Sequence, residues 1–408
     1  MATKKLKIIN DPIYGFIQIP YESVFKLIEH PYFQRLRRIR QLGLTHLVYP
    51  GAHHTRFHHA IGAMHLMTEA IEVLRRKGHI IFEEEAEAVV IAILLHDIGH
   101  GPFSHTLENS LVSSVSHEEI SGFFMERLND DFNGALTLAI RIFYNKYPKK
   151  FLHQLVSGQL DMDRLDYLNR DSFFTGVSEG VISSERIIKM LEICNDEIVV
   201  EAKGIYSIEK FIIARRLMYW QVYMHKTVVS AENLLINILN RAREVIQSGK
   251  EVFATPSLRK ILSHDFKRED FVSNSSLLDV FASLDDSDIS SAIKVWVMNP
   301  DKILSDLCYR LVNRKLFKIK LQDRPFVDEV ILSTKNELIN TLHIPEKEIK
   351  YYFLQGKLIN NAYVADHDKI NILYPNGTLV DIAEAADTLN IKILSNPVEK
   401  YYMCYPAL

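Results

Sequence analysis

The sequence predicts a mainly α-helical protein, with a helical body over residues 1–320 and a smaller mixed α/β lobe over residues 321–408. From Tyr21 to about Lys320 the apolar residues recur every three or four positions, which is the helical period. Beyond that point, stretches such as KINILYPNGTLVDI and EKYYMCYPAL alternate more like strands. Between two such strands, Tyr374–Gly377 (YPNG) has the composition of a hairpin turn.

Within the body, apolar periodicity predicts individual helices, and glycines mark their ends. The expected helices are Val24–Gln41, Arg56–Arg76, Glu84–His96, Gly158–Arg170 and a long helix at Ile208–Ile246. The punctuating glycines are Gly51, Gly99, Gly101 and Gly176.

Composition excludes several classes of protein. Lys and Arg number 48 against 51 Asp and Glu, so the net charge of −3 does not favour a broadly basic binder of nucleic acid or membranes. The three cysteines are far apart and form no CxxC motif, which is typical of free thiols in a reducing compartment. No segment has the roughly 20 apolar residues of a membrane span, or the apolar core of a signal peptide. We therefore expect a cytoplasmic protein.

The segment LLHDIGHGPFSH (Leu94–His105) joins an apolar helix to a cluster of titratable groups. The run Val89–Leu95 is almost continuously apolar and is expected to lie in the core. His96 and Asp97 follow it, and the glycines and proline after them end the helix. Near a helix end, both side chains can reach the same point in space.

Two other segments have the same character. RFHHAIGAMH places a pair of histidines at the start of a helix, after Thr55 as a plausible N-cap. LDMDRLDYLNRD places Asp163, Tyr167 and Arg170 on one helical face, with Asp166 beside it. Two histidines and two carboxylates suit a divalent ion of the Mn, Fe, Co, Ni or Zn type. A site with open positions could also hold water or a phosphate oxygen.

The order His59, then His96–Asp97, then Asp163 resembles the H…HD…D signature of the HD-domain phosphohydrolases. The likeness extends over about Lys7–Ile246 and thins out beyond it. Six segments look like the branch of deoxynucleoside triphosphate (dNTP) triphosphohydrolases, which includes dGTPase-like bacterial proteins. They are NDPIYGFIQIP, FQRLRRIRQLG, YPGAHHTRFHHAIG, LLHDIGHGPFSH, SHEE and DMDRLDYLNRD. This resemblance implies an HD-domain body that hydrolyses a dNTP to the deoxynucleoside and inorganic triphosphate.

The resemblance also implies the chemical roles of individual residues. The ligands of one divalent transition metal would be His59, His96, Asp97 and Asp163, and Mg would accompany the triphosphate. His100, His105 and His117 would contact the α-phosphate and transfer protons. His117 is the first choice for the general acid and His105 the next, with Glu118 and Glu108 orienting the imidazole. Histidine suits this task because its pKa lies near neutrality. Solvated loop histidines remain the alternative for this group.

A substrate pocket follows from the same resemblance. Its expected members are Arg56, Arg164, Arg215 and Lys226 for the triphosphate, and Gln41, Leu42, Tyr167, Asp171 and Tyr223 for the deoxyribose. An apolar wall against the 2′ carbon would reject a ribonucleotide, because its 2′-hydroxyl would lose water without gaining a partner. Arg164 stands where the family commonly has Lys. The alternatives are that Arg56 makes a helix-capping salt bridge and that Tyr223 belongs to the core.

Some relatives are tetramers that bind an activating nucleotide between subunits, so a homo-oligomer, either dimer or tetramer, is expected. The residues that resemble this regulatory pocket are Lys7, Asn10, Glu29, Gln34 and Arg37, although Glu29 replaces the usual Asp. Ordinary surface polar residues are the alternative.

Two rival functions remain open from the sequence. One is an HD phosphohydrolase that acts on nucleoside mono- or diphosphates or on cyclic nucleotides. The other is a nucleotide-sensing or nucleic-acid-binding module with a structural metal, for which the basic stretch RLRRIR (Arg35–Arg40) is the main support.

Overall fold

The computed structural model describes residues 7–103, 106–112, 115–360, 363, 369–386 and 397–407, with only the backbone of Glu108 and Asn109. In chain order the first elements are β1 (Ile8–Asp11), β2 (Gly15–Gln18), α1 (Glu22–Glu29), α2 (Pro31–Gln34), α3 (Arg56–Arg76), α4 (Glu83–Leu95), α5 (Glu108–Leu111), α6 (His117–Asp131), α7 (Thr137–Phe143), α8 (Lys150–Val156), α9 (Met162–Thr175) and α10 (Ser184–Met190). They are followed by β3 (Leu191–Cys194), β4 (Glu197–Glu201), α11 (Ile205–Met218), α12 (Lys226–Gln247), α13 (Pro256–Ser263), α14 (Arg268–Ser273), α15 (Ser275–Ala282), α16 (Asp286–Trp296) and α17 (Lys302–Val312). The last elements are β5 (Lys318–Gln322), α18 (Asp328–Leu342), β6 (Leu354–Asn360), β7 (Asn371–Leu373), β8 (Leu379–Asp381), α19 (Ile382–Ala385) and β9 (Val398–Tyr405).

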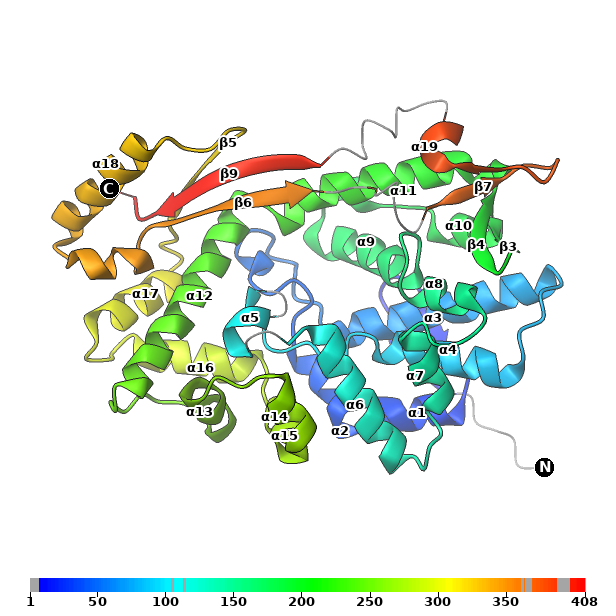
Figure 1. The fold of residues 1–408 in the computed structure, drawn as a ribbon, viewed down its shortest axis with the longest axis horizontal. Helices are drawn as coiled ribbons and strands as arrows, with labels where there is room; N and C mark the ends of the chain where they lie inside the picture. The colour runs from blue at the N-terminus through cyan, green and yellow to red at the C-terminus, as the bar shows by residue number, and fades with distance from the viewer. Residues whose placement is uncertain are drawn as a thin grey trace.

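The molecule is elongated, with a large helical body at one end and a smaller lobe of strands and helices at the other (Figure 1). Helix α12 packs against β5 of the lobe and against α17 and α13 of the body. The predicted fold class, a mainly helical body with a smaller mixed α/β lobe, is therefore confirmed.

Three helices form the centre of the body. Helix α3 packs against both α4 and α9, and the apolar run Val89–Leu95 of α4 is buried throughout, as its sequence predicts. Burial of such aliphatic side chains stabilises the fold by about 1.5–3 kcal/mol each. The core therefore fixes the positions from which the start of α3 and the end of α4 emerge.

The structure corrects three of the expected helices. The one expected at Gly158–Arg170 runs instead from Met162 to Thr175, because Asp161 caps its start and Gly176 its end. The helix expected at Val24–Gln41 is broken at His30, whose extended backbone (ψ 139°) precedes Pro31. Proline disfavours a helical conformation in the residue before it, and this signal decides the break. The long helix expected at Ile208–Ile246 is also broken, by a wider turn at Tyr219–Tyr223 and by an extended His225 that caps α12.

The strands of the C-terminal region belong to two sheets. Strands β5, β9 and β6 form an antiparallel sheet in that order in the lobe, while β7 and β8 extend the β3–β4 pair of the body. The predicted turn at Tyr374–Gly377 does connect β7 to β8 as a hairpin. Since β7 pairs in parallel with β4, part of the tail returns to the body, and the division at residue 320 stays a prediction.

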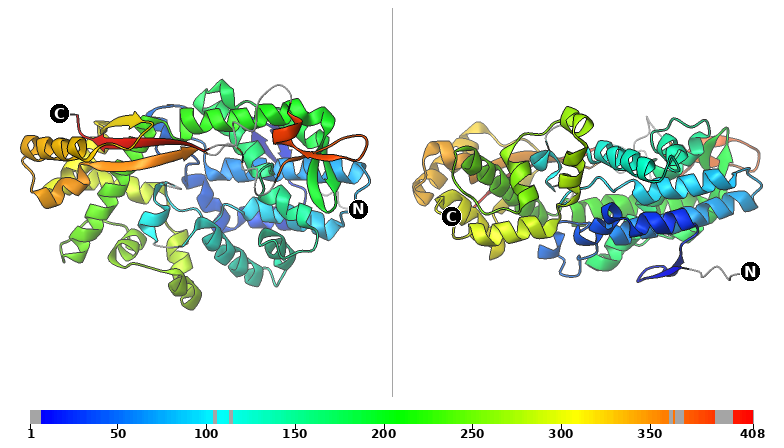
Figure 2. Two further views of the ribbon diagram at one scale, coloured as in Figure 1. Left: turned by 45° about the horizontal axis from the view of Figure 1, so that its top comes forward. Right: turned by 90° about the horizontal axis from the view of Figure 1, so that it is seen from below.

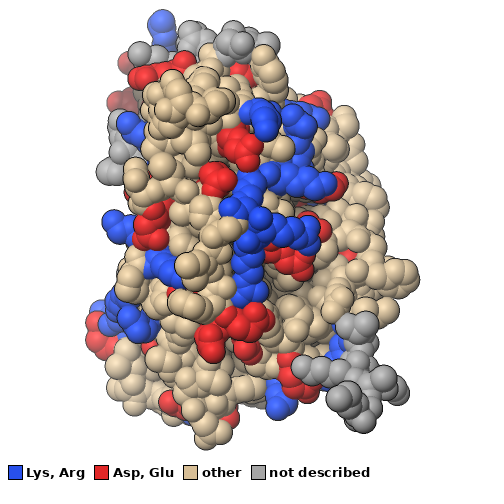
Figure 3. Space-filling view, turned by 90° about the vertical axis from the view of Figure 1, so that its right-hand side faces the viewer, with Lys and Arg blue, Asp and Glu red and all other residues tan. Residues whose placement is uncertain are grey.

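The surface agrees with the balanced charge of the sequence. The face in Figure 3 carries a column of Lys and Arg side chains, with Asp and Glu side chains on either side of it. Among the residues that the structure describes, no helix is both long and apolar enough to cross a membrane.

The β1–β2 hairpin lies at the edge of the body, near the blue helices of the N-terminal region (Figure 2).

Gly62 permits the close packing of α3 against α9, and this requirement can be tested. A Cβ atom at Gly62 would overlap the buried Asp166 carboxylate and Arg170 guanidinium. We expect Gly62→Ala to lower the free energy of unfolding by about 3 kcal/mol or more, because neither buried group can move without losing its partner. Chemical denaturation followed by circular dichroism measures this loss.

A matched control for this substitution is Gly122→Ala in helix α6. A Cβ atom there would also overlap a side chain, the hydroxyl end of Tyr144, but that residue is 39% exposed and can swing away. Because Ala favours a helix over Gly, we expect Gly122→Ala to stay within about 1 kcal/mol of the wild type. Equal losses for the two variants would contradict this account of Gly62.

Candidate metal centre

The first part of the site is the N-terminal turn of α3. Thr55 is the N-cap, as predicted, and Arg56 and His59 point from the first turn into the body, where both are buried. The Nδ1 atom of His59 lies 2.8 Å from an oxygen of Asp166, so this nitrogen is the proton donor and Nε2 faces the site.

The second part is the turn after α4. His96 is the C-cap of α4, and its Nδ1 atom lies 2.6 Å from the carbonyl oxygen of Ile93. A carbonyl can only accept, so Nδ1 carries the proton and Nε2 of His96 also faces the site. A Cβ atom at Gly99 would overlap the backbone of α6 at His117 and Ser121, which explains why this turn requires glycine.

A buried arginine, Arg35, makes hydrogen bonds to the backbone of the same turn. The guanidinium of Arg35 donates to the carbonyl oxygens of Ile98 (2.7 Å) and His100 (2.6 Å). The rings of Phe124 and Phe281 lie 5.5 Å from its centre. Burial lowers the pKa of Arg35 to about 9. Arg35 therefore links the first helical segment directly to the turn that carries Asp97.

The third part is helix α9. Asp161 is its N-cap and also makes an ion pair with Arg164, while Asp163 projects toward His59 and His96. Asp166, one turn further on, accepts from His59. Helix α9 thus supplies one carboxylate to the centre and another behind it.

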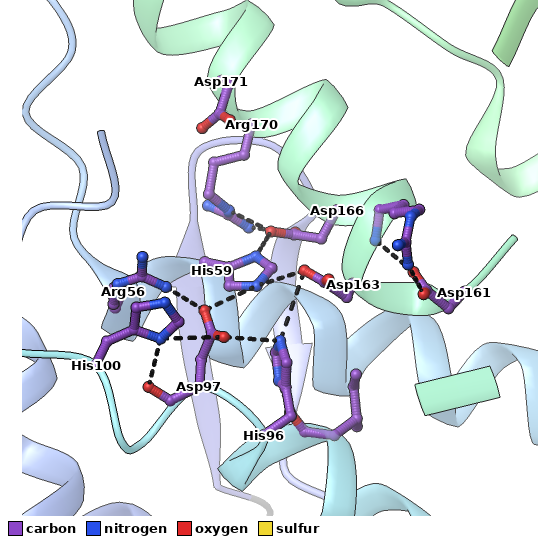
Figure 4. A network of polar contacts seen from close by, with 12 residues as sticks. Arg56, His59, His96, Asp97, His100, Asp161, Asp163, Asp166, Arg170 and Asp171 are labelled. Carbon is purple, nitrogen blue, oxygen red and sulfur yellow. Dashed lines mark hydrogen bonds and ion pairs between the residues drawn. The ribbon is translucent and has the colours of Figure 1, made fainter. Parts of the chain in front are cut away.

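The predicted metal ligands meet at one point, as Figure 4 shows. An oxygen of Asp163 lies 3.1 Å from Nε2 of His59 and 3.5 Å from Nε2 of His96. The carboxylate of Asp97 lies 3.4 Å from Nε2 of His96 and 3.7 Å from Nε2 of His59. Two atoms bound at about 2.1 Å to one ion are about 3.0–3.4 Å apart, so this set can close around a single cation with little movement.

The free imidazole nitrogens support the same interpretation. Among the described residues, the Nε2 atoms of His59 and His96 are buried and have no hydrogen-bond partner. Leaving a buried polar atom unpaired costs free energy, and a metal ion would remove that cost. The donor set therefore fits a divalent ion that accepts nitrogen and oxygen ligands.

The electrostatics of the centre favour bound positive charge. Although burial opposes it, the neighbouring carboxylates of Asp163 and Asp166 raise the pKa of His59 to about 10. Burial also opposes ionisation of Asp97, but His96 and Arg56 lower its pKa to about 2. The raised pKa of His59 and the lowered pKa of Asp97 both reflect the attraction between positive charge and the carboxylates of this centre.

A second group of possible ligands adjoins the first. Asp97, His100 and His117 each offer a ligand atom, and these atoms lie within 4.8 Å of one another. The rings of His100 and His117 stack with their centres 3.9 Å apart. Glu118 lies 3.9 Å from His117, beyond hydrogen-bonding distance, and its side chain is 71% exposed. His105 and the side chain of Glu108 lie outside the described residues.

Two of the predicted phosphate-binding arginines, Arg56 and Arg164, make ion pairs within the protein. Arg56 makes an ion pair with Asp97, one of the candidate metal ligands. The alternative that Arg56 is a salt-bridge residue therefore describes part of what the structure shows. Arg164 pairs with Asp161, and the Nε atoms of Arg164 and Arg215 are buried without a hydrogen-bond partner among the described residues. Lys226, the first residue of α12, is exposed.

The predicted sugar-binding residues lie close to one another. The rings of Tyr167 and Tyr219 lie 6.0 and 5.2 Å from that of Tyr223. The hydroxyl of Tyr223 donates to Asp171 over 2.8 Å. Leu42 is half-buried against the core, and Oε1 of Gln41 is buried without a hydrogen-bond partner in the described part of the chain. Arg215, Tyr223 and Lys226, which fall within the single helix expected at Ile208–Ile246, instead lie in α11, in the wider turn Tyr219–Tyr223 and at the start of α12.

The expected regulatory residues fall into separate contacts. Gln34 and Arg37 are joined by a 2.9 Å hydrogen bond, whereas Lys7 lies over the ring of Phe25. Asn10 and Glu29 are exposed. Their role in binding a nucleotide stays a prediction.

Sequence reasoning missed the residues behind the site. Asp166 was placed only beside the ligand face, Arg170 had no partner, and neither His54 nor Arg35 was selected. The imidazole of His54 lies 2.7 Å from Asp171, and both groups are buried. The spacing of Asp166 and Arg170 by four residues was a usable signal, since this spacing allows an ion pair on a helix.

Comparison with known proteins agrees with this geometry. Residues 56–169 match the HD domain, and residues 182–266 match the HD associated region. A crystal structure of a phosphohydrolase from Bacteroides thetaiotaomicron matches with a TM-score of 0.95 at 53% sequence identity, covering 99% of this chain and 100% of that one.

Two curated relatives extend the comparison. The uncharacterized protein YwfO of Bacillus subtilis is 35% identical over 76% of this chain and 71% of its own length. The SAMHD1 homolog of Dictyostelium discoideum, named a deoxynucleoside triphosphate triphosphohydrolase, is 31% identical over 62% of this chain. The match spans about half of that protein, 52% of its length. From its HD domain, its HD associated region and its full-length structural match, this chain belongs to the HD-domain phosphohydrolase family.

Proposed function

We propose that this protein is a metal-dependent dNTP triphosphohydrolase, which converts a dNTP and water into the deoxynucleoside and inorganic triphosphate. The observation that carries the proposal is the convergence of His59, His96, Asp97 and Asp163 beside the stacked pair His100 and His117. The name of the Dictyostelium relative supports this substrate class over other phosphate esters.

The four converging residues would hold one divalent transition metal of the Mn, Fe, Co, Ni or Zn type, with Mg accompanying the triphosphate. When bound, such an ion polarises a phosphate oxygen and lowers the pKa of a bound water. In both His59 and His96, a hydrogen bond from Nδ1 fixes the orientation of the imidazole ring. Both rings therefore already present Nε2 to the centre. This preorganisation limits the movement needed when substrate arrives.

Cleavage at the α-phosphorus breaks the bond to the 5′ oxygen of the sugar, which must then receive a proton. His117 is our first candidate for this proton, because it begins helix α6, is only partly buried and stacks on His100. His105 is the second candidate. Negative charge on the triphosphate would be offset by Arg164, Arg215 and Lys226, and by Arg56 after it exchanges its partner Asp97.

The tyrosines and Asp171 supply the selectivity for the sugar. Tyr223 donates to one oxygen of Asp171 and His54 lies against the other, so the carboxylate is held in one orientation. Asp171 and Gln41 would receive the 3′-hydroxyl, while Leu42, Tyr167 and Tyr223 would wall off the 2′ carbon. A ribonucleotide would then bury its 2′-hydroxyl without a partner.

Regulation forms a further part of the proposal. Lys7 comes directly before β1 and Asn10 lies in it, while Glu29, Gln34 and Arg37 lie in α1, in α2 and in the helical turn Arg35–Arg38 after it. They would bind an activating nucleotide between subunits of a homo-oligomer.

A product assay decides the reaction. We expect the purified protein with Mn to release intact triphosphate from at least one dNTP, given alone or with a second nucleotide as activator. NTPs should react at least about tenfold more slowly, because the 2′-hydroxyl is rejected. Chromatography of the products measures both outcomes. Release of single phosphate from a monophosphate, or cleavage of a cyclic nucleotide, would contradict the proposal.

The metal ligands can be tested apart from activity. We expect Asp163→Ala to lose the bound transition metal, since it removes the carboxylate oxygen that lies 3.1 Å from Nε2 of His59 and 3.5 Å from Nε2 of His96. Elemental analysis of the purified variant measures metal content. Asp130→Ala, which changes an exposed aspartate at the end of α6, should keep the wild-type content. A full metal complement in Asp163→Ala would rule out this ligand.

The role of His117 gives a separate prediction. We expect His117→Ala to lower kcat by about 10²–10⁴-fold, the usual contribution of a general acid, without changing the metal content. His264→Ala, which changes an exposed histidine of another segment, should leave both quantities unchanged. Loss of a metal ion from His117→Ala would instead make this residue a ligand and contradict our assignment.

A further inference from the structure

The metal centre is connected to the N-terminal hairpin by an unbroken chain of buried charged groups. His59 Nδ1 lies 2.8 Å from Oδ2 of Asp166. The guanidinium of Arg170 donates to both oxygens of Asp166, over 2.9 Å each, and its third contact is a 2.8 Å bond to Asp11. All four side chains are buried, and Figure 4 shows the part of the chain from His59 to Arg170.

Asp11 belongs to an element that contributes no ligand. It is the last residue of β1, and its Oδ1 atom accepts the backbone N–H groups of Ile13 (2.9 Å) and Tyr14 (3.1 Å) in the hairpin turn. The ring of Tyr14 lies 5.6 Å from the guanidinium of Arg170. The hairpin therefore contacts Arg170 through both a carboxylate and an aromatic ring.

The hydrogen bonds of Arg170 and His59 share one acceptor atom. Oδ2 of Asp166 accepts from both Arg170 and His59, so a shift of the guanidinium moves the acceptor that orients the imidazole. The glycine at position 62 shows that the packing around this ion pair leaves no room even for a methyl group. A rigid, fully paired contact of this kind transmits displacement, whereas a solvated one would absorb it.

We propose that Asp11 is a positioning residue for the metal centre, acting on His59 through Arg170 and Asp166. This inference rests on the metal centre proposed above. Without the Asp11 carboxylate, one arm of the Arg170 fork loses its partner in a buried environment. The guanidinium then has to move, and the orientation of His59 Nε2 toward the cation is no longer fixed.

The test is a double-mutant cycle on metal affinity, measured in the full chain by competition with a chelator for Co²⁺. We expect Asp11→Asn to weaken Co²⁺ binding roughly 3- to 10-fold, less than the 10- to 100-fold typical of a direct partner of a ligand. Asp166→Asn should weaken it more. In the Asp166→Asn background, Asp11→Asn should have almost no further effect, because the link to His59 is already cut.

The control separates positioning from a general loss of stability. Asp301→Asn breaks an equally well-formed ion pair with Arg241, whose nitrogens lie 2.9 and 2.6 Å from Asp301 in another part of the molecule. It should lower the Tm but leave both Co²⁺ affinity and the visible absorption spectrum of the bound Co²⁺ unchanged. Asp11→Asn should alter that spectrum, since the position of an imidazole ligand changes.

Other results would overturn either the positioning role of Asp11 alone or the metal centre as well. Wild-type Co²⁺ affinity in Asp11→Asn, or fully additive effects of Asp11→Asn and Asp166→Asn, would overturn the positioning role alone. Failure of the wild-type protein to bind Co²⁺ would overturn the metal centre together with it. Should Asp11→Asn not fold, Arg170→Lys takes its place, because an ammonium cannot span both carboxylates. Unchanged affinity in that variant would likewise overturn the proposal.

Discussion

The hydrogen bond between His59 and Asp166 is the constraint on which the site depends. An imidazole offers two nitrogens, and it can serve as a ligand only if the correct one is free and aimed. Asp166 occupies Nδ1 of His59, and Arg170 holds Asp166 by two bonds. Because these groups are buried, each needs its partner, and the packing of α3 on α9 is fixed by charge as well as by apolar contact.

The fold could be predicted from the sequence wherever a single periodicity ran without interruption. The apolar run Val89–Leu95 gave α4 within a residue of its observed ends, and Arg56–Arg76 matched α3. The expectation at Val24–Gln41 was wrong because Pro31 outweighed the apolar spacing around it. The break near Tyr219–Tyr223 has no such signal, since neither proline nor glycine occurs there.

The sequence predicted the candidate metal ligands, but it did not predict the residues that orient them. Motif spacing placed His96 and Asp97 at a helix end, and the structure brings both to His59 and Asp163. Spacing could not tell that Asp166 would lie behind His59, because this depends on the angle at which α9 crosses α3. Contacts between distant segments, such as His54 with Asp171, also leave no local pattern in the sequence.

Charge explains why four carboxylates, three of them buried, can lie so close together. The connected cluster contains four carboxylates and two guanidinium groups, from Asp11, Asp97, Asp163, Asp166, Arg56 and Arg170. With neutral histidines it carries two excess negative charges, which equals the charge that one divalent cation would offset. The same negative charge raises the pKa of His59. The same charge balance that stabilises the packed helices therefore makes the centre a receptor for a divalent ion.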